Sequence, residues 1–169
     1  FNPSSGLLEP FNPELTQGGV ELQWTKEAWL RKGEIVVGEM LDDTFTSADG
    51  GFEYTVFDIG GQGWDVGVTG EYLYDDRDQT RLPVTLFEND VFVGTRITLN
   101  DIQDNEFLAG AIVDDQTGSA IASEEFQRRL GDTLLLEVEA RLFTAENDDP
   151  FVSALNADNN LLIRLTRYF

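Results

Sequence analysis

Apolar and polar residues alternate along much of this 169-residue chain. The clearest stretch is WDVGVTGEYLY at positions 64–74. Side chains of a strand point to opposite faces in turn, so this pattern predicts a strand with one apolar and one polar face. DVFVGTRITLN (90–100) and DTLLLEVEARLF (132–143) repeat the pattern. Each of the three stretches therefore predicts a strand.

Further segments predict strands, most with less regular alternation; they are 20–30, 34–41, 52–59, 107–113, 120–130 and 161–169. Clusters of Gly, Asn and Asp separate the segments, as they do in chains of many short strands. With the three regular stretches they give about nine strands, so the fold class is all-β.

The expected connections alternate in length. The short ones are 31–34, 60–63, 100–105 and 129–132, and the others, mostly longer and acidic, are 42–51, 75–90, 114–119 and 144–160. Short turns at one end and longer loops at the other are typical of an antiparallel up-and-down transmembrane β-barrel. The pattern thus predicts a meander of strands with two different ends.

Composition removes several classes of function. The chain has 32 acidic and 11 basic residues, a formal charge of −21, which excludes a nucleic-acid partner because phosphate binding needs a positive surface. It has no Cys and no His, so the usual general base and the commonest transition-metal ligands are missing. We therefore expect no enzyme activity, no metal and no cofactor.

The last residues, NNLLIRLTRYF, continue the alternation up to an aromatic C-terminus. With this ending and the alternating strands with aromatic ends, residues 19–169 resemble the bacterial outer-membrane β-barrel proteins. The segments RRLGDTLLLEVEARLF and RYF resemble segments of uncharacterised porin-like proteins of Proteobacteria. Position 167 is Arg, where an aromatic or aliphatic residue is more common.

The resemblance implies a location in the bacterial outer membrane, with the lipid bilayer and lipopolysaccharide as partners. It also implies recognition by the outer-membrane insertion machinery, through a C-terminal signal made of Leu161, Ile163, Leu165 and Phe169.

In a membrane barrel the two strand faces meet lipid and lumen. The residues expected to face the membrane are Trp64, Val66, Val68, Tyr72, Tyr74, Val91, Val93, Ile97, Leu134, Leu136, Val138 and Leu142. Those expected to line the lumen are Glu21, Glu27, Asp65, Glu71, Arg96, Arg129, Glu137, Glu139, Arg141 and Arg164. Such charges either select solutes in a water-filled pore or pair across neighbouring strands in a narrow barrel.

Bacterial single-chain barrels have an even number of strands, whereas this chain predicts about nine. We therefore expect 19–169 to be the C-terminal portion of a larger even-stranded barrel, or one piece of a split barrel completed by another subunit. Residues 1–18 contain Pro3, Pro10 and Pro13, which disfavour a regular strand. This segment is expected to be an extracellular loop or irregular.

The function expected is a porin-like channel for small polar solutes or ions. The alternatives are a non-conducting outer-membrane scaffold that anchors a partner and a soluble ligand-binding β-barrel with its apolar face inward. Carboxylate pairs could also serve glycoside cleavage. The acidic loops DDRD (75–78) and NDDP (147–150) could hold Ca²⁺, although neither has the EF-hand spacing.

Overall fold

A computed structural model describes residues 12–83, 85, 87–146 and 149–169 of the protein. The strands are β1 (Leu15–Lys26), β2 (Trp29–Met40), β3 (Asp43–Val56), β4 (Asp65–Asp75), β5 (Asn89–Thr98), β6 (Glu106–Asp114), β7 (Ala120–Leu130), β8 (Leu134–Thr144) and β9 (Asn160–Arg167). A 3₁₀ turn, η1 (Ile59–Gly61), follows β3, and a short helix, α1 (Pro150–Leu155), lies in the β8–β9 connection.

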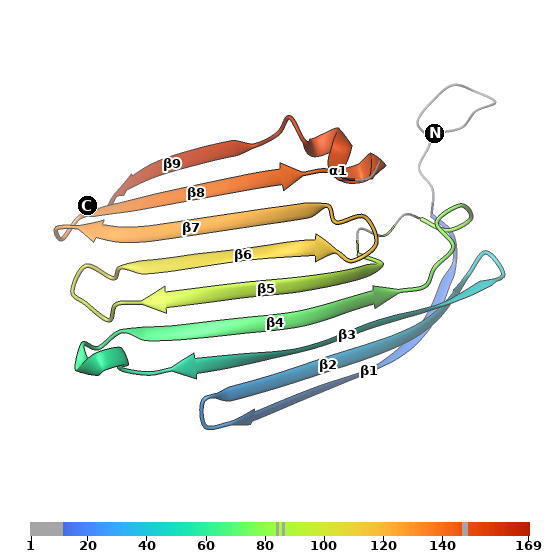
Figure 1. Ribbon diagram of the computed structural model, residues 1–169, viewed down its shortest axis with the longest axis horizontal. Coiled ribbons are helices and arrows are strands. Elements are labelled where there is room, and N and C mark those ends of the chain that lie inside the picture. Colours follow the sequence, from blue (N-terminus) through green and yellow to red (C-terminus); the bar gives the residue numbers. More distant parts are fainter. Residues whose placement is uncertain (1–11, 84, 86, 147–148) are drawn as a thin grey trace.

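The strands form one antiparallel sheet in which each pairs with its neighbour in the sequence, in the order β1 to β9. Figure 1 shows this meander as a continuous change of colour across a twisted, curved sheet. Within the described residues β1 and β9 pair only with β2 and β8, so the sheet is open. The expected nine-strand, up-and-down antiparallel arrangement is confirmed, whereas the described residues do not close it into a barrel.

The register divides the sheet into two faces, because directly opposed residues point to the same side. One cross-strand row contains Val66, Ile97, Phe107, Phe126, Val138 and Ile163, and we call its side the apolar face. The row Asp65, Thr98, Glu106, Gln127, Glu137 and Arg164 lies on the other side, which we call the acid-rich face. The alternation in each strand is therefore in phase across the sheet.

The two faces differ in exposure. On the apolar face, Leu22, Val93 and Ile163 expose 71%, 53% and 63% of their surface. The buried strand residues Phe45, Asp75 and Asp90 lie on the acid-rich face and expose 5%, 5% and 4%. The acid-rich face is thus the sheltered side of the sheet, and the apolar face is the open one.

Two expected connections lie inside strands. The segment 31–34 is part of β2, and the chain instead turns at Glu27 and Ala28, where Glu27 has a φ of +54°. The segment 42–51 belongs mostly to β3, and the turn is formed by Leu41 and Asp42. Asp, Ser and Gly in that segment are typical of loops, but pairing with both β2 and β4 holds the backbone extended.

The N-terminal boundary is also displaced, since β1 begins at Leu15 rather than at the expected Gly19. Residues 1–11, which make up most of the expected irregular segment, lie outside the described residues.

Candidate functional site

The register places the residues expected to face lipid together. All of them that belong to strands lie on the apolar face, and Trp64, just before β4, is exposed. The C-terminal set joins them, because Leu161, Ile163 and Leu165 lie opposite Ala140, Val138 and Leu136 of β8. Phe169 follows the end of β9 and is fully exposed.

The residues expected to line a lumen also share one side, with one correction. Glu21, Asp65, Glu71, Arg96, Arg129, Glu137, Glu139, Arg141 and Arg164 lie on the acid-rich face. Glu27 does not, because it lies in the β1–β2 turn with left-handed backbone. That turn had been expected four residues later, which put Glu27 inside a strand.

Sequence reasoning missed much of the charge on this face. Strand positions on it hold fourteen acidic residues, Glu21, Glu34, Asp43, Asp49, Glu53, Asp65, Glu71, Asp75, Asp90, Glu106, Asp114, Glu125, Glu137 and Glu139. They hold five basic ones, Lys32, Arg96, Arg129, Arg141 and Arg164. The acid-rich face therefore presents a strongly negative field.

Several of the basic residues are neutralised by close partners. Arg164 Nη1 lies 3.7 Å and 3.8 Å from Oε1 of Glu137 and of Glu139, on the adjacent strand. Arg96 Nε lies 3.2 Å from Glu106 Oε1, and Lys32 Nζ reaches over β3 to Glu71 Oε2 at 2.8 Å. Arg129 pairs with Asp104 in the β5–β6 turn. Cross-strand pairing thus occupies most of the positive charge.

The apolar face carries few charges. Lys26, Arg31, Glu39, Arg128 and Arg167 lie near strand ends. Glu124 alone lies at mid-strand, between Ala109 and Ala140. Aromatic residues gather near the β1–β2 turn, where the Trp29 ring centroid lies 4.6 Å from that of Tyr54 and 5.9 Å from that of Phe52.

Two adjoining cavities lie on the acid-rich face. The first, of about 250 Å³, extends from Glu53 in β3 to Ser123 and Glu125 in β7 and is lined mainly by apolar groups. The second, of about 230 Å³, is lined by Glu106, Gln127, Glu137 and Glu139 among others. Arg96, Leu108 and Glu125 line both, so the two cavities share a boundary.

Glycines form the floor of the first cavity. A Cβ on Gly94 would lie 2.8 Å from Phe92 Cζ, and one on Gly110 would lie 2.7 Å from Phe92 Cε2. The Phe92 ring therefore lies against both backbones, which only glycine permits at this distance. The tip of the Phe92 ring thus covers two glycines in the middle of the acid-rich face.

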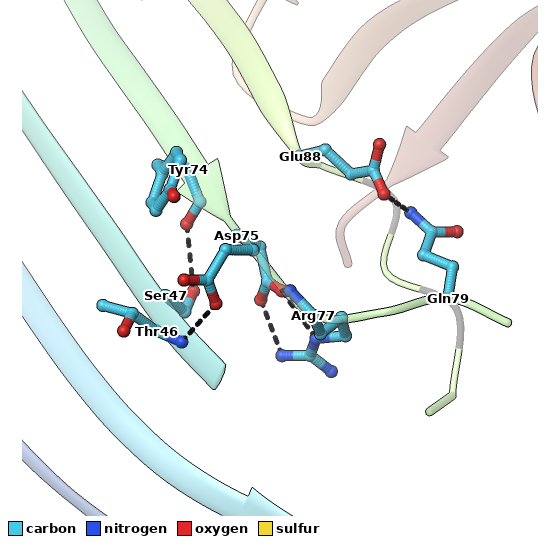
Figure 2. A network of polar contacts seen from close by, with 8 residues as sticks. Thr46, Ser47, Tyr74, Asp75, Arg77, Gln79 and Glu88 are labelled. Carbon is cyan, nitrogen blue, oxygen red and sulfur yellow. Dashed lines mark hydrogen bonds and ion pairs between the residues drawn. The ribbon is translucent and has the colours of Figure 1, made fainter. Parts of the chain in front are cut away.

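A polar network ties the β4–β5 connection onto the end of the same face (Figure 2). Arg77 donates from Nε and Nη2 to the two carboxylate oxygens of buried Asp75, at 2.7 Å each. Its guanidinium also lies over the Phe45 ring, 4.5 Å from the centroid. Arg81 Nη1 lies 2.8 Å from Asp43 Oδ2. The connection thus crosses the acid-rich face at the end of the sheet where β4 ends and β5 begins.

The network changes the interpretation of the DDRD segment, because the Asp75 carboxylate is occupied by Arg77 rather than free for a cation. In the part of the chain that the structure describes, no three His, Cys, Asp or Glu side chains are grouped so as to hold a metal ion. Asn147 and Asp148 of the second acidic loop lie outside the described residues.

Carboxylates in the connections stabilise turns. Asp101 accepts hydrogen bonds from the backbone N–H and side-chain Nδ2 of Asn105, at 3.1 Å and 2.6 Å, and these bonds lower the pKa of Asp101. Asp78 accepts from the hydroxyl and backbone N–H of Thr80, which lowers the pKa of Asp78. Both groups therefore remain charged over most of the pH range.

Comparison with known proteins gives no match: no family model, no curated protein and no solved structure is similar to this chain. Among the described residues, no helix has the length and apolar character needed to cross a membrane.

Proposed function

We propose that this chain forms nine strands of the wall of an outer-membrane β-barrel of the porin-like kind, which passes small polar solutes or ions. One observation carries the proposal. Apolar side chains follow one face across all nine strands, and many of them are exposed, whereas the middle of the acid-rich face is sheltered and hollowed. A lipid contact outside and water inside would satisfy both faces.

The alternative of a soluble ligand-binding barrel places apolar side chains inward and charged ones outward. Here the exposures run the other way within one central strand, since Val93 of β5 is 53% exposed and Asp90 of the same strand is buried. Besides the nine-stranded sheet, the described residues form only the 3₁₀ turn η1 and the six-residue helix α1, which lies against β8. The described residues therefore contain no second layer that would cover the apolar face in water.

The number of strands favours completion by further strands. In an antiparallel sheet of nine, β1 and β9 run in the same direction, as Figure 1 shows, so they cannot close against each other as an antiparallel pair. An all-antiparallel barrel has an even number of strands. We propose that an odd number of strands, from the same polypeptide or another, joins the free edges of β1 and β9.

The test is conductance of the native protein, purified in detergent from its own membrane and added to a planar bilayer. The proposal expects discrete current steps and a gel mobility that changes on heating, as folded membrane barrels show. Because the acid-rich face carries fourteen acidic and five basic residues, the reversal potential in a salt gradient should indicate preference for cations. A monodisperse protein in detergent-free buffer would contradict the proposal.

A non-conducting scaffold is the second candidate, favoured by the β4–β5 connection that crosses the end of the acid-rich face. It predicts the same membrane location and the same gel shift without current steps.

A further inference from the structure

The acid-rich face is not uniformly polar. Its middle carries the apolar cavity of about 250 Å³, whose walls include Phe92, Leu108, Ile112 and Ile121. A wall that only conducts water and ions has no need for a built apolar recess. The volume is below the roughly 300 to 1,000 Å³ of drug-sized pockets, so the recess suits a small molecule.

Charge at the rim limits which small molecule fits. Glu53 and Glu125 line the cavity on opposite sides, from β3 and β7, and among the described residues neither forms an ion pair within 4.0 Å. Arg96 also lines the cavity, but its guanidinium is paired with Glu106. The rim therefore offers two carboxylates that form no ion pair within 4.0 Å. The basic groups near them are paired elsewhere, Arg96 with Glu106 and Lys32, whose charge also acts on Glu53, with Glu71.

The aromatic floor adds a second attraction for positive charge. The ring of Phe92 lies against Gly94 and Gly110, and their lack of side chains keeps the recess open above the sheet. Cations are attracted to the face of an aromatic ring, the more so where water is partly excluded. The adjoining cavity continues the negative field, with Glu106, Glu137 and Glu139 in its lining.

From this arrangement we propose that the cavity over Phe92 binds a small organic cation, with its apolar body on the ring and its charged group toward the carboxylates of the rim, Glu53 and Glu125. The inference rests on the proposed porin-like function and deepens it, because it names the class of solute that the acid-rich face recognises. It predicts a saturable binding site rather than a featureless pore.

Binding is tested by calorimetry on the native protein in detergent micelles, with benzyltrimethylammonium as the probe. The same ring bearing an anion, phenylacetate, and a neutral group, benzyl alcohol, are the matched probes. We expect the cation to bind at least about tenfold more tightly than either, since cation–π and carboxylate attraction together contribute on the order of that ratio. Equal binding of all three probes would overturn the proposal.

Variants separate the site from the general negative field. E53Q and E125Q keep the side-chain shape and should each weaken cation binding roughly threefold to tenfold. E34Q, on the same face but outside both cavities, should leave it unchanged. A loss with E34Q equal to that with E125Q would show that only diffuse charge attracts the probe.

The outcome is independent of conduction. Current steps without discrimination among the probes would support the pore and contradict the binding site. Selective binding of the cation without current steps would support the binding site and contradict the pore.

Discussion

At the scale of single residues, glycines let the Phe92 ring lie against the backbone and leave room for the cavity above it. A Cβ at Gly110 would lie 2.7 Å from the Phe92 ring and 3.3 Å from the carbonyl oxygen of Val93, so even a methyl group has no room. Gly50, on the apolar face of β3, has no atom within 4 Å of the corresponding position. These two glycines look alike in the sequence and have opposite structural roles.

The substitution G110A should therefore destabilise the fold by about 1 to 3 kcal/mol, because the Phe92 ring must move. The control G50A should be neutral or slightly stabilising, since alanine restricts the unfolded chain without a clash. Urea unfolding in micelles, followed by tryptophan fluorescence, measures both. Equal effects at the two positions would contradict the contact between Phe92 and Gly110.

Asp101 gives the pH dependence of one turn. The hydrogen bonds from Asn105 lower the pKa of Asp101 in the folded state. The charged carboxylate therefore stabilises the fold above the unfolded pKa of about 3.9, and this stabilisation is lost as the pH falls through the folded pKa. D101N should remove this part of the acid sensitivity. Stability should then fall less between pH 4 and pH 3 in the variant than in the wild type, and equal slopes would refute the assignment.

At the scale of elements, the tight turns show how local preference and sheet register compete. Leu41 and Asp42 join β2 to β3 with φ values of +55° and +62°, a conformation that favours Asn and Gly. Leu41 is unusual at the first position of such a turn, because left-handed backbone disfavours leucine. The pairing of β2 with β3 imposes the turn.

Replacing the pair by Asn–Gly, L41N together with D42G, should raise the free energy of unfolding by about 1 kcal/mol. Leu41 is 45% exposed, so little buried contact is lost. The midpoint of urea unfolding is the measurement. A lower midpoint would show that the Leu41 side chain contributes more to the folded state than its exposure indicates.

The β4–β5 connection depends on Arg77, which is the sole ion-pair partner within 4.0 Å that the described residues give to buried Asp75. R77Q would leave that carboxylate buried without its charge partner, at a cost of about 3 kcal/mol. We expect faster proteolysis within the connection and, for a conducting protein, a larger unitary current. K26Q, at an exposed position with no ion pair in the described structure, serves as the control and should change neither.

At the scale of the whole molecule, the proposal depends on which face meets lipid. Val93 lies in the middle of β5 on the apolar face and is 53% exposed. An arginine there should cost about 2 to 4 kcal/mol at the bilayer midplane. E34R places the same side chain on the acid-rich face, where it meets the acidic neighbours Glu21 and Asp49.

Insertion into lipid vesicles, scored by the heat-dependent gel shift, compares V93R with E34R. V93R should reduce the inserted fraction strongly and E34R should not. Normal insertion of V93R would contradict a lipid contact at this face.

The local pattern of the sequence predicted the regular strands well. In β4, β5 and β8 the apolar face is occupied mostly by apolar and aromatic residues, so the period of two is visible without knowledge of the neighbours. In β3 the residues Ser47, Asp49 and Gly50 resemble a loop, and only hydrogen bonds from both sides keep them extended. The same limitation displaced the first turn and with it the assignment of Glu27.

By itself, the sequence predicted about nine strands, a meander and two chemically different faces, because the faces follow from a short-range period and sequential strands usually lie side by side. The tertiary structure alone decided the register, which brought the acidic residues of eight strands onto one face and set Arg164 between Glu137 and Glu139. It also decided the apolar cavity, because Phe92 covers two glycines, one of them on the next strand. A local pattern of apolar and polar residues carries no information on contacts between residues distant in the chain. These contacts could therefore be identified only in the folded structure.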